Sequence, residues 1–193
     1  MRQVHYRYQD PLEVIWLHAA TRMGMQVERS TDVFAAWDGR GVLTIGTPET
    51  LDADDSVAQM ILHETCHALI EGPESFTKPD WGVQIDNPAH RVREHATLRL
   101  QAALTAPYGL RLFFAATTNF RRYYDQLPED PLQGHDEATE LARAGWQRAT
   151  SGPWSQPLTA ALETSAAIAR LVAPAAVADS LWSQFGAHPS INK

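Results

Sequence analysis

Hydrophobic and polar positions follow a helical period at the start of the chain and a strand period shortly afterwards. Asp10 and Pro11 are typical of a helix N-terminus, and apolar groups recur at helical spacing over residues 12–22, so a first helix is expected to end near Gly24. Three short segments rich in Val, Ile, Phe and Trp come next, at residues 26–29, 32–37 and 41–46. Their composition predicts strands.

Asp38 and Gly39, between the last two of these segments, are a typical hairpin signal. We therefore expect a small antiparallel sheet. The next helix is predicted to start after residues 52–55, to contain SVAQMILHETCHALIE and to stop at Gly72. Its apolar side chains point in nearly every direction around the axis, which indicates a buried helix.

The second half of the chain has mostly helical patterns. Residues 72–89 contain three prolines and two glycines without a steady period and are expected to form a loop. Helical patterns then recur between proline or glycine positions, at residues 90–106, 109–126, 134–149, 157–172 and 175–185. The predicted fold class is α+β, with one domain over residues 1–193 in which a small sheet packs on the buried helix and a mostly helical half follows.

Composition narrows the classes of function. The formal net charge of -7 and the pI near 5.5 provide no basic field for nucleic acid or anionic lipid. No apolar run approaches the roughly 20 residues of a membrane-spanning helix, and the N-terminus lacks the apolar stretch of a secretory signal. Cys66 is the only cysteine, so no disulfide forms within the chain. We expect a soluble, cytoplasmic protein with neither nucleic acid nor membrane as partner.

The chemistry is carried by His63-Glu64-Thr65-Cys66-His67, an HExxH pattern inside the buried helix. At 3.6 residues per turn the two histidines lie one turn apart on one face and can bind one ion. Glu64 points about 100° away from His63, which suits a general base beside a metal-activated water. Burying such groups without partners costs about 1 to 3 kcal/mol each, so one bound Zn²⁺ per chain is favoured over a chance match.

A catalytic zinc site needs a third protein ligand. The downstream candidates are Asp80, Asp86, His90, Glu94 and His95. Asp80 and Asp86 lie in the predicted loop, where carboxylates are commonly solvated. Glu94 and His95 flank the apolar face of the predicted helix 90–106 on opposite sides. The helical pattern alone therefore does not choose between these two.

On these residues the sequence resembles the ImmA/IrrE family of zinc metallopeptidases, which belongs to the zincins. In that family a small sheet precedes the HExxH helix, and a second helix supplies a glutamate followed by an alanine-rich run that closes at a proline. The matching features here are Glu94, Gln101-Ala102-Ala103-Leu104 and Pro107. The resemblance implies a zincin-like metal-binding core at residues 10–107 with a helical part at 108–193, Glu94 as third ligand, and a narrow regulatory cleavage.

Other side chains have weaker assignments. Peptide hydrolysis needs a donor that stabilises the developing oxyanion. Among Tyr108, Tyr123, Tyr124 and His135, we favour His135 or Tyr124. Cys66 is expected to be a small buried thiol. The remaining histidines, His5, His18, His90 and His188, are expected to be structural or solvated.

By analogy with zincins, the strand Val42-Leu43-Thr44-Ile45 would bind extended polypeptide as an added strand, and the loop 72–89, with Phe76 and Trp81, would shape specificity. We therefore expect a zinc-dependent hydrolase that cleaves peptide bonds of a specific protein or peptide. Two alternatives stay open. One is a non-catalytic zinc-binding sensor or maturation partner, against which the intact Glu64 argues. The other is an amidase acting on a small modified peptide, which a closed aromatic pocket at 72–89 would favour.

Overall fold

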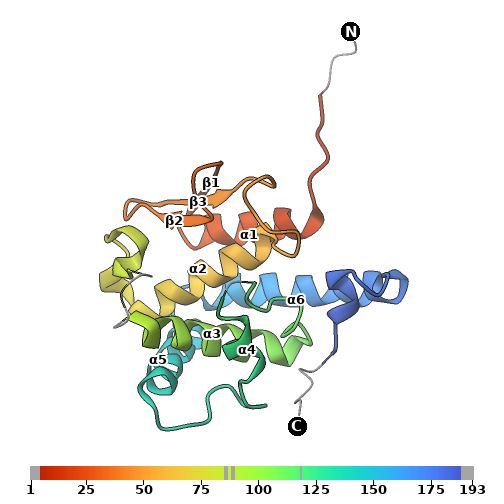
Figure 1. Cartoon of the computed structure of the whole chain (residues 1–193). Helices are drawn as coiled ribbons and strands as arrows, with labels where there is room; N and C mark the ends of the chain where they lie inside the picture. Colours follow the sequence, from red (N-terminus) through yellow and green to blue (C-terminus); the bar gives the residue numbers. More distant parts are fainter. Residues whose placement is uncertain (1–4, 85–86, 88–89, 118, 188–193) are drawn as a thin grey trace.

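The first described part of the chain is an extended arm that leads into a helix and a small sheet (Figure 1). The computed structural model describes residues 5–84, 87, 90–117 and 119–187. Helix α1 (Pro11–Arg22) is capped by Asp10, whose Oδ1 accepts hydrogen bonds from the backbone N–H groups of Leu12 (2.9 Å) and Glu13 (3.1 Å). The cap provides partners for two N–H groups that have none inside the helix, and the helix start expected at Asp10 is confirmed.

Three strands form a mixed sheet in the order β1-β3-β2. β2 (Ala35–Trp37) and β3 (Val42–Gly46) are the expected antiparallel hairpin around Asp38 and Gly39. β1 (Gln26–Ser30) runs parallel to β3 instead, so the expectation of a purely antiparallel sheet is wrong. A hairpin signal fixes only the two strands that it joins, whereas the direction of β1 depends on how the preceding helix packs.

The central place of β3 in the sheet corrects a second expectation. Its backbone pairs with β1 over residues 42–46 and with β2 over residues 43–45. An added strand needs a free edge. The strand Val42-Leu43-Thr44-Ile45 is therefore not available to bind a substrate in this way, and the edges of the sheet are β1 and β2.

Helix α2 (Val57–Glu71) carries the HExxH residues and is the buried helix expected from the sequence. The side chain of Ser56 accepts a hydrogen bond from the Gln59 N–H (3.1 Å) at its start, and Gly72 ends it with a φ of 81° that favours glycine. It packs against α1, α3 (Arg91–Thr105) and α5 (Glu137–Ser151), and Figure 1 shows it beneath the sheet. These neighbours cover most of its surface, as its apolar pattern predicts.

Of the four helices predicted after residue 106, two are present in the described residues and two are not. The predicted helices at 134–149 and 157–172 correspond to α5 and α6 (Ser155–Val172). The segment 175–185 contains the short 3₁₀ turn η6 (Leu181–Gln184) after η5 (Ala173–Ala175), and the helix predicted there is wrong. Pro174 in η5 has no N–H to continue α6, which explains the stop.

The long helix predicted at 109–126 is also wrong. The 3₁₀ turn η4 (Ala106–Tyr108) ends at Gly109, whose φ is 69°, and α4 covers only Arg121–Asp125. Residues 110–116 between them are mostly buried without being helical. The carbonyls of Phe114 and Ala115 accept hydrogen bonds from the side-chain amides of Gln101 (2.5 Å) and Gln59 (3.2 Å). Because side chains provide these partners, the apolar segment can be buried outside a helix.

A hydrophobic cluster connects the sheet and most of the helices, from Leu12 in α1 to Ala169 in α6, and a smaller one surrounds Leu98 and Tyr124. The protein is thus α+β and mostly helical, with a small mixed sheet. None of the described helices is both long enough and apolar enough to cross a membrane.

Candidate metal centre

His63 and His67 on α2 form a compact cluster with Glu94 on α3. Nε2 of His67 lies 3.1 Å from Nε2 of His63 and 3.2 Å from Oε2 of Glu94, and Nε2 of His63 lies 3.6 Å from Oε1 of Glu94. Ligand atoms bound tetrahedrally at about 2.0 to 2.1 Å from a zinc ion are roughly 3.3 to 3.4 Å apart. The three side chains therefore have the spacing needed to hold one metal ion.

Two residues of α3 orient the histidine rings. Nδ1 of His63 lies 2.9 Å from Oε1 of Gln101, and Nδ1 of His67 lies 3.2 Å from the hydroxyl of Thr97. The amide of Gln101 has one orientation because its Nε2 donates to the Phe114 carbonyl (2.5 Å). The Gln101 oxygen can only accept, so it favours the His63 tautomer with its proton on Nδ1. The Thr97 hydroxyl does the same for His67 when it accepts, and each Nε2 lone pair is then left for a metal.

The three α3 residues of the centre share one face of their helix. Glu94, Thr97 and Gln101 are separated by three and four residues, as neighbours on a helix surface are, and all three are buried. The same spacing rule places His63 and His67 on the facing side of α2. Sequence reasoning missed Thr97 and Gln101, although their spacing from Glu94 was a signal that could have found them.

His67 and Glu94 are an electrostatically coupled pair. Their side chains are only 7% and 10% exposed. Burial lowers the pKa of His67, but the hydrogen-bonded carboxylate of Glu94 outweighs it and raises this pKa to about 9. Burial opposes ionisation of Glu94 as well, yet the positive charges of His63 and His67 bring its pKa down to about 2. A metal ion must therefore displace a proton from His67 at neutral pH.

Glu64 lies outside the cluster, as expected for a general base and not for a ligand. The residue is 9% exposed, and its Oε2 accepts a hydrogen bond from the indole N–H of Trp81 (2.8 Å). Trp81 belongs to the 3₁₀ turn η2 (Pro79–Gly82), which follows η1 (Pro73–Ser75) in the predicted loop after α2. The sequence holds no signal for this contact, because the turn has no regular period.

The other candidate ligands have different partners. Asp80 is exposed and its Oδ1 accepts the backbone N–H of Trp37 (3.1 Å). His90 accepts the backbone N–H of Gln84 at Nδ1 (2.7 Å), and His95 stacks on the ring of Tyr123 with centroids 3.7 Å apart. Asp86 lies outside the described residues. Of the five candidates, Glu94 is the one that the described structure brings to the histidine pair.

Tyr124 does not fit the role of oxyanion donor. Its side chain is fully buried, its hydroxyl donates to the Arg111 carbonyl (2.8 Å), and burial raises its pKa. This corrects one of the two assignments made from sequence. The long helix predicted at 109–126 is absent, and Tyr124 on the short α4 joins the small hydrophobic cluster instead of the histidine and glutamate cluster.

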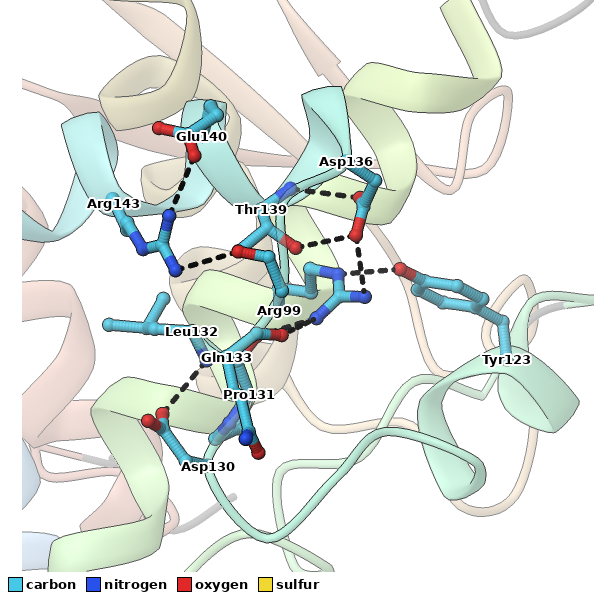
Figure 2. A network of polar contacts seen from close by, with 11 residues as sticks. Arg99, Tyr123, Asp130, Pro131, Leu132, Gln133, Asp136, Thr139, Glu140 and Arg143 are labelled. Carbon is cyan, nitrogen blue, oxygen red and sulfur yellow. Dashed lines mark hydrogen bonds and ion pairs between the residues drawn. The ribbon is translucent and has the colours of Figure 1, made fainter.

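His135 is exposed and lies between α4 and α5. Arg99 on α3 anchors the neighbouring residues of this segment (Figure 2). The guanidinium of Arg99 donates to the Pro131 carbonyl (2.8 Å) and to the Tyr123 hydroxyl (2.9 Å), and it forms an ion pair with Asp136 (3.4 Å). The described structure does not bring His135 into the histidine and glutamate cluster.

The remaining side chains singled out from the sequence are largely where they were expected. Cys66 is fully buried, and burial raises the pKa of its thiol. His5 and His18 are exposed. His188 lies outside the described residues.

No protein-family model, curated protein or solved structure matches this chain. The resemblance to ImmA/IrrE peptidases and the zincin-like packing therefore stay predictions. The chain is an α+β protein with a candidate metal centre. Two histidines of the buried helix α2 and one glutamate of α3 form this centre.

Proposed function

We propose that this protein is a zinc-dependent hydrolase that cleaves peptide bonds in a specific protein or peptide. The observation that carries the proposal is the three-ligand cluster together with Glu64, which lies outside the cluster but close enough for its charge to raise the pKa of His67. A structural zinc site usually has four protein ligands, whereas a catalytic site has three and leaves a position for water or substrate. The side chain of His63 keeps 20% of its surface exposed, which gives solvent a route to the cluster.

The donor set supports zinc as the metal. Two imidazole nitrogens and one carboxylate oxygen are a common ligand set of catalytic zinc. His63, His67 and Glu94 would hold the ion, and a zinc ion bound there would make water acidic enough to attack at neutral pH and would polarise the substrate carbonyl. The two histidine nitrogens lie 3.1 Å apart and each lies within 3.6 Å of an oxygen of Glu94, which is close to the separation of ligands around a tetrahedral zinc ion.

Residues of α2 and α3 would carry out proton transfer and ligand orientation. Glu64 takes the proton of the attacking water and passes it to the amine that leaves. Thr97 and Gln101 keep the two imidazoles in the ligand tautomer. All of these side chains come from α2 and α3, and the packing of these two helices against each other supports a shared site for the proposed base and ligands.

The edge of β2 is the better candidate for binding an extended substrate. The Gly46 N–H donates to the Phe34 carbonyl and the Asp38 N–H to the Val42 carbonyl, so residues 34, 36 and 38 turn their backbone groups toward β3. Ala35 and Trp37 therefore turn theirs outward. The Trp37 N–H already donates to the Asp80 carboxylate. The outward backbone groups of Ala35 are therefore the ones proposed to pair with a substrate strand.

The aromatic residues after α2 favour a polypeptide over a small modified peptide as substrate. Phe76 stacks on Trp154 with centroids 4.8 Å apart and meets the edge of Trp81 at 5.9 Å. Trp81 is 2% exposed. These rings pack against one another and extend the core, instead of lining a pocket for a small ligand.

The metal is tested by measuring zinc per chain after purification without chelator. We expect about one zinc in the wild type and in Glu64→Gln, and a loss in His67→Ala and Glu94→Ala. His95→Ala is the matched control, because it removes a histidine next to Glu94 that stacks on Tyr123 instead. Wild-type protein that stays metal-free when zinc is offered would overturn the proposal.

Catalysis is tested with zinc-loaded protein and a library of peptides derived from whole-cell digests, with cleavage sites read by mass spectrometry. The wild type should create new termini that Glu64→Gln, with its zinc retained, does not create. If Glu64→Gln cleaves as well as the wild type, Glu64 is not the base. A fully zinc-loaded wild type that cleaves nothing would instead favour the zinc-binding sensor.

A further inference from the structure

The loop after α2 contains two residues in a backbone conformation that is rare outside glycine. Asp80 has a φ of 47° and Trp81 a φ of 56°, and they are the only non-glycine residues with positive φ in the described part of the chain. Such backbone geometry costs free energy and persists where surrounding contacts enforce it, often at functional sites. The contacts of the two side chains show what this conformation achieves.

Both side chains contact Trp37 on β2, and Trp81 also contacts Glu64 on α2. The Asp80 carboxylate accepts the N–H of Trp37 on β2, and the Trp81 ring lies flat on the Trp37 ring, with centroids 4.3 Å apart and planes 7° apart. The Trp81 indole N–H then reaches Glu64 Oε2 at 2.8 Å. The strained turn therefore directs one indole N–H at the proposed general base.

Packing alone does not account for a tryptophan at this position. A phenylalanine ring could also stack on Trp37, but it has no N–H to donate. The Glu64 carboxylate is nearly buried, and a buried carboxylate without hydrogen bonds is unfavourable. With Oε2 held by Trp81, rotation about the last side-chain bond of Glu64 is restricted, and Oε1 has a defined direction.

We propose that Trp81 is a positioning residue for Glu64: its indole N–H, held in place by the left-handed turn at Asp80 and Trp81, fixes the carboxylate beside the His63, His67 and Glu94 cluster. This inference rests on the proposed function for its consequence in catalysis. The contact itself is independent of whether the protein cleaves a peptide. The test below uses readouts other than hydrolysis for this reason.

The first readout is the binding of acetohydroxamic acid to zinc-loaded protein. This small zinc chelator gives its hydroxyl proton to a neighbouring carboxylate when it binds as the hydroxamate anion, so its affinity reports on the position of Glu64. Trp81→Phe should weaken binding about tenfold, as loss of an orienting hydrogen bond does in metal sites, with zinc content unchanged. Glu64→Ala should weaken it at least as much, and the double variant should match Glu64→Ala.

Trp37→Phe is the matched control. Trp37 belongs to the same ring stack and is also buried, but its indole N–H donates to the Phe76 carbonyl (3.0 Å) and not to Glu64. It should therefore leave hydroxamate binding unchanged. Equal weakening by the two tryptophan variants would assign Trp81 to packing and overturn the proposal. Additive effects of Trp81→Phe and Glu64→Ala would also overturn it.

The second readout is the indole N–H signal of Trp81 in protein labelled with ¹⁵N-tryptophan, assigned by its loss in Trp81→Phe. It should exchange slowly with D₂O and should shift in Glu64→Ala, while the Trp37 signal stays in place. This measurement works equally on metal-free protein, so a failure to bind zinc or to cleave peptides leaves it decisive. A Trp81 signal that does not respond to Glu64→Ala would overturn the proposal.

Discussion

Replacing Thr97 by valine tests the hydrogen bond that α3 provides to His67, one of the proposed metal ligands. The hydroxyl of Thr97 lies 3.2 Å from Nδ1 of His67, and both side chains are almost completely buried. Valine has nearly the same shape but no acceptor for the Nδ1 proton. In the metal-free protein His67 can release its Nδ1 proton and keep its Nε2–H on Glu94, whereas in the zinc-bound state Nε2 is occupied and Nδ1–H depends on Thr97. The substitution should therefore weaken zinc binding more than it weakens folding.

The magnitude follows from the burial of this hydrogen bond. A buried donor left without a partner costs about 1 to 3 kcal/mol, which corresponds to a loss of roughly 5- to 160-fold in affinity. Loss of orienting partners in other metal sites costs about 10- to 100-fold. We therefore expect the zinc Kd of Thr97→Val to rise about 10- to 100-fold, measured by competition with a chromogenic zinc chelator.

Thr105→Val provides the control on the same helix. Thr105 is equally buried, but its hydroxyl donates to the Gln101 carbonyl of its own helix (2.7 Å) and does not contact a histidine. Its zinc affinity should stay near that of the wild type. If Thr97→Val binds zinc as tightly as the wild type, or if both variants lose affinity equally, the reasoning about the His67 tautomer is refuted.

Three further predictions follow from the same structure. Because Glu94 raises the pKa of His67 to about 9 from an ordinary 6.5, metal-free protein should lose stability as pH rises from about 6.5 through about 9, and urea unfolding should show this slope flattened in Glu94→Gln. Zinc at a hundred times its Kd should raise the unfolding free energy by about 2.7 kcal/mol; calorimetry should show this gain removed by chelator and absent in His67→Ala. Cys66 should react with a disulfide reagent only when denaturant unfolds the protein, because it is fully buried and burial raises its pKa; rapid labelling of native protein would contradict this.

The local pattern of the sequence determined α1, the β2–β3 hairpin and α2, because each has its signals within a few residues. Asp10 and Pro11 mark a helix start, Asp38 and Gly39 mark a turn, and the spacing of His63 and His67 places both on one helix face. These properties depend on backbone preferences and helical period, which neighbouring residues already encode. Two metal ligands and the general base could be proposed on that basis.

Only the tertiary structure decided which partners these elements meet. Glu94 and His95 flanked the same predicted helix face equally, and the packing of α3 against α2 brought Glu94 to the histidines and turned His95 to Tyr123. The parallel pairing of β1, the burial of Tyr124 and the contact of Trp81 with Glu64 likewise join residues far apart in the chain. Local propensity does not encode such contacts, since their free energy comes from burial and hydrogen bonds that exist only after the chain has folded.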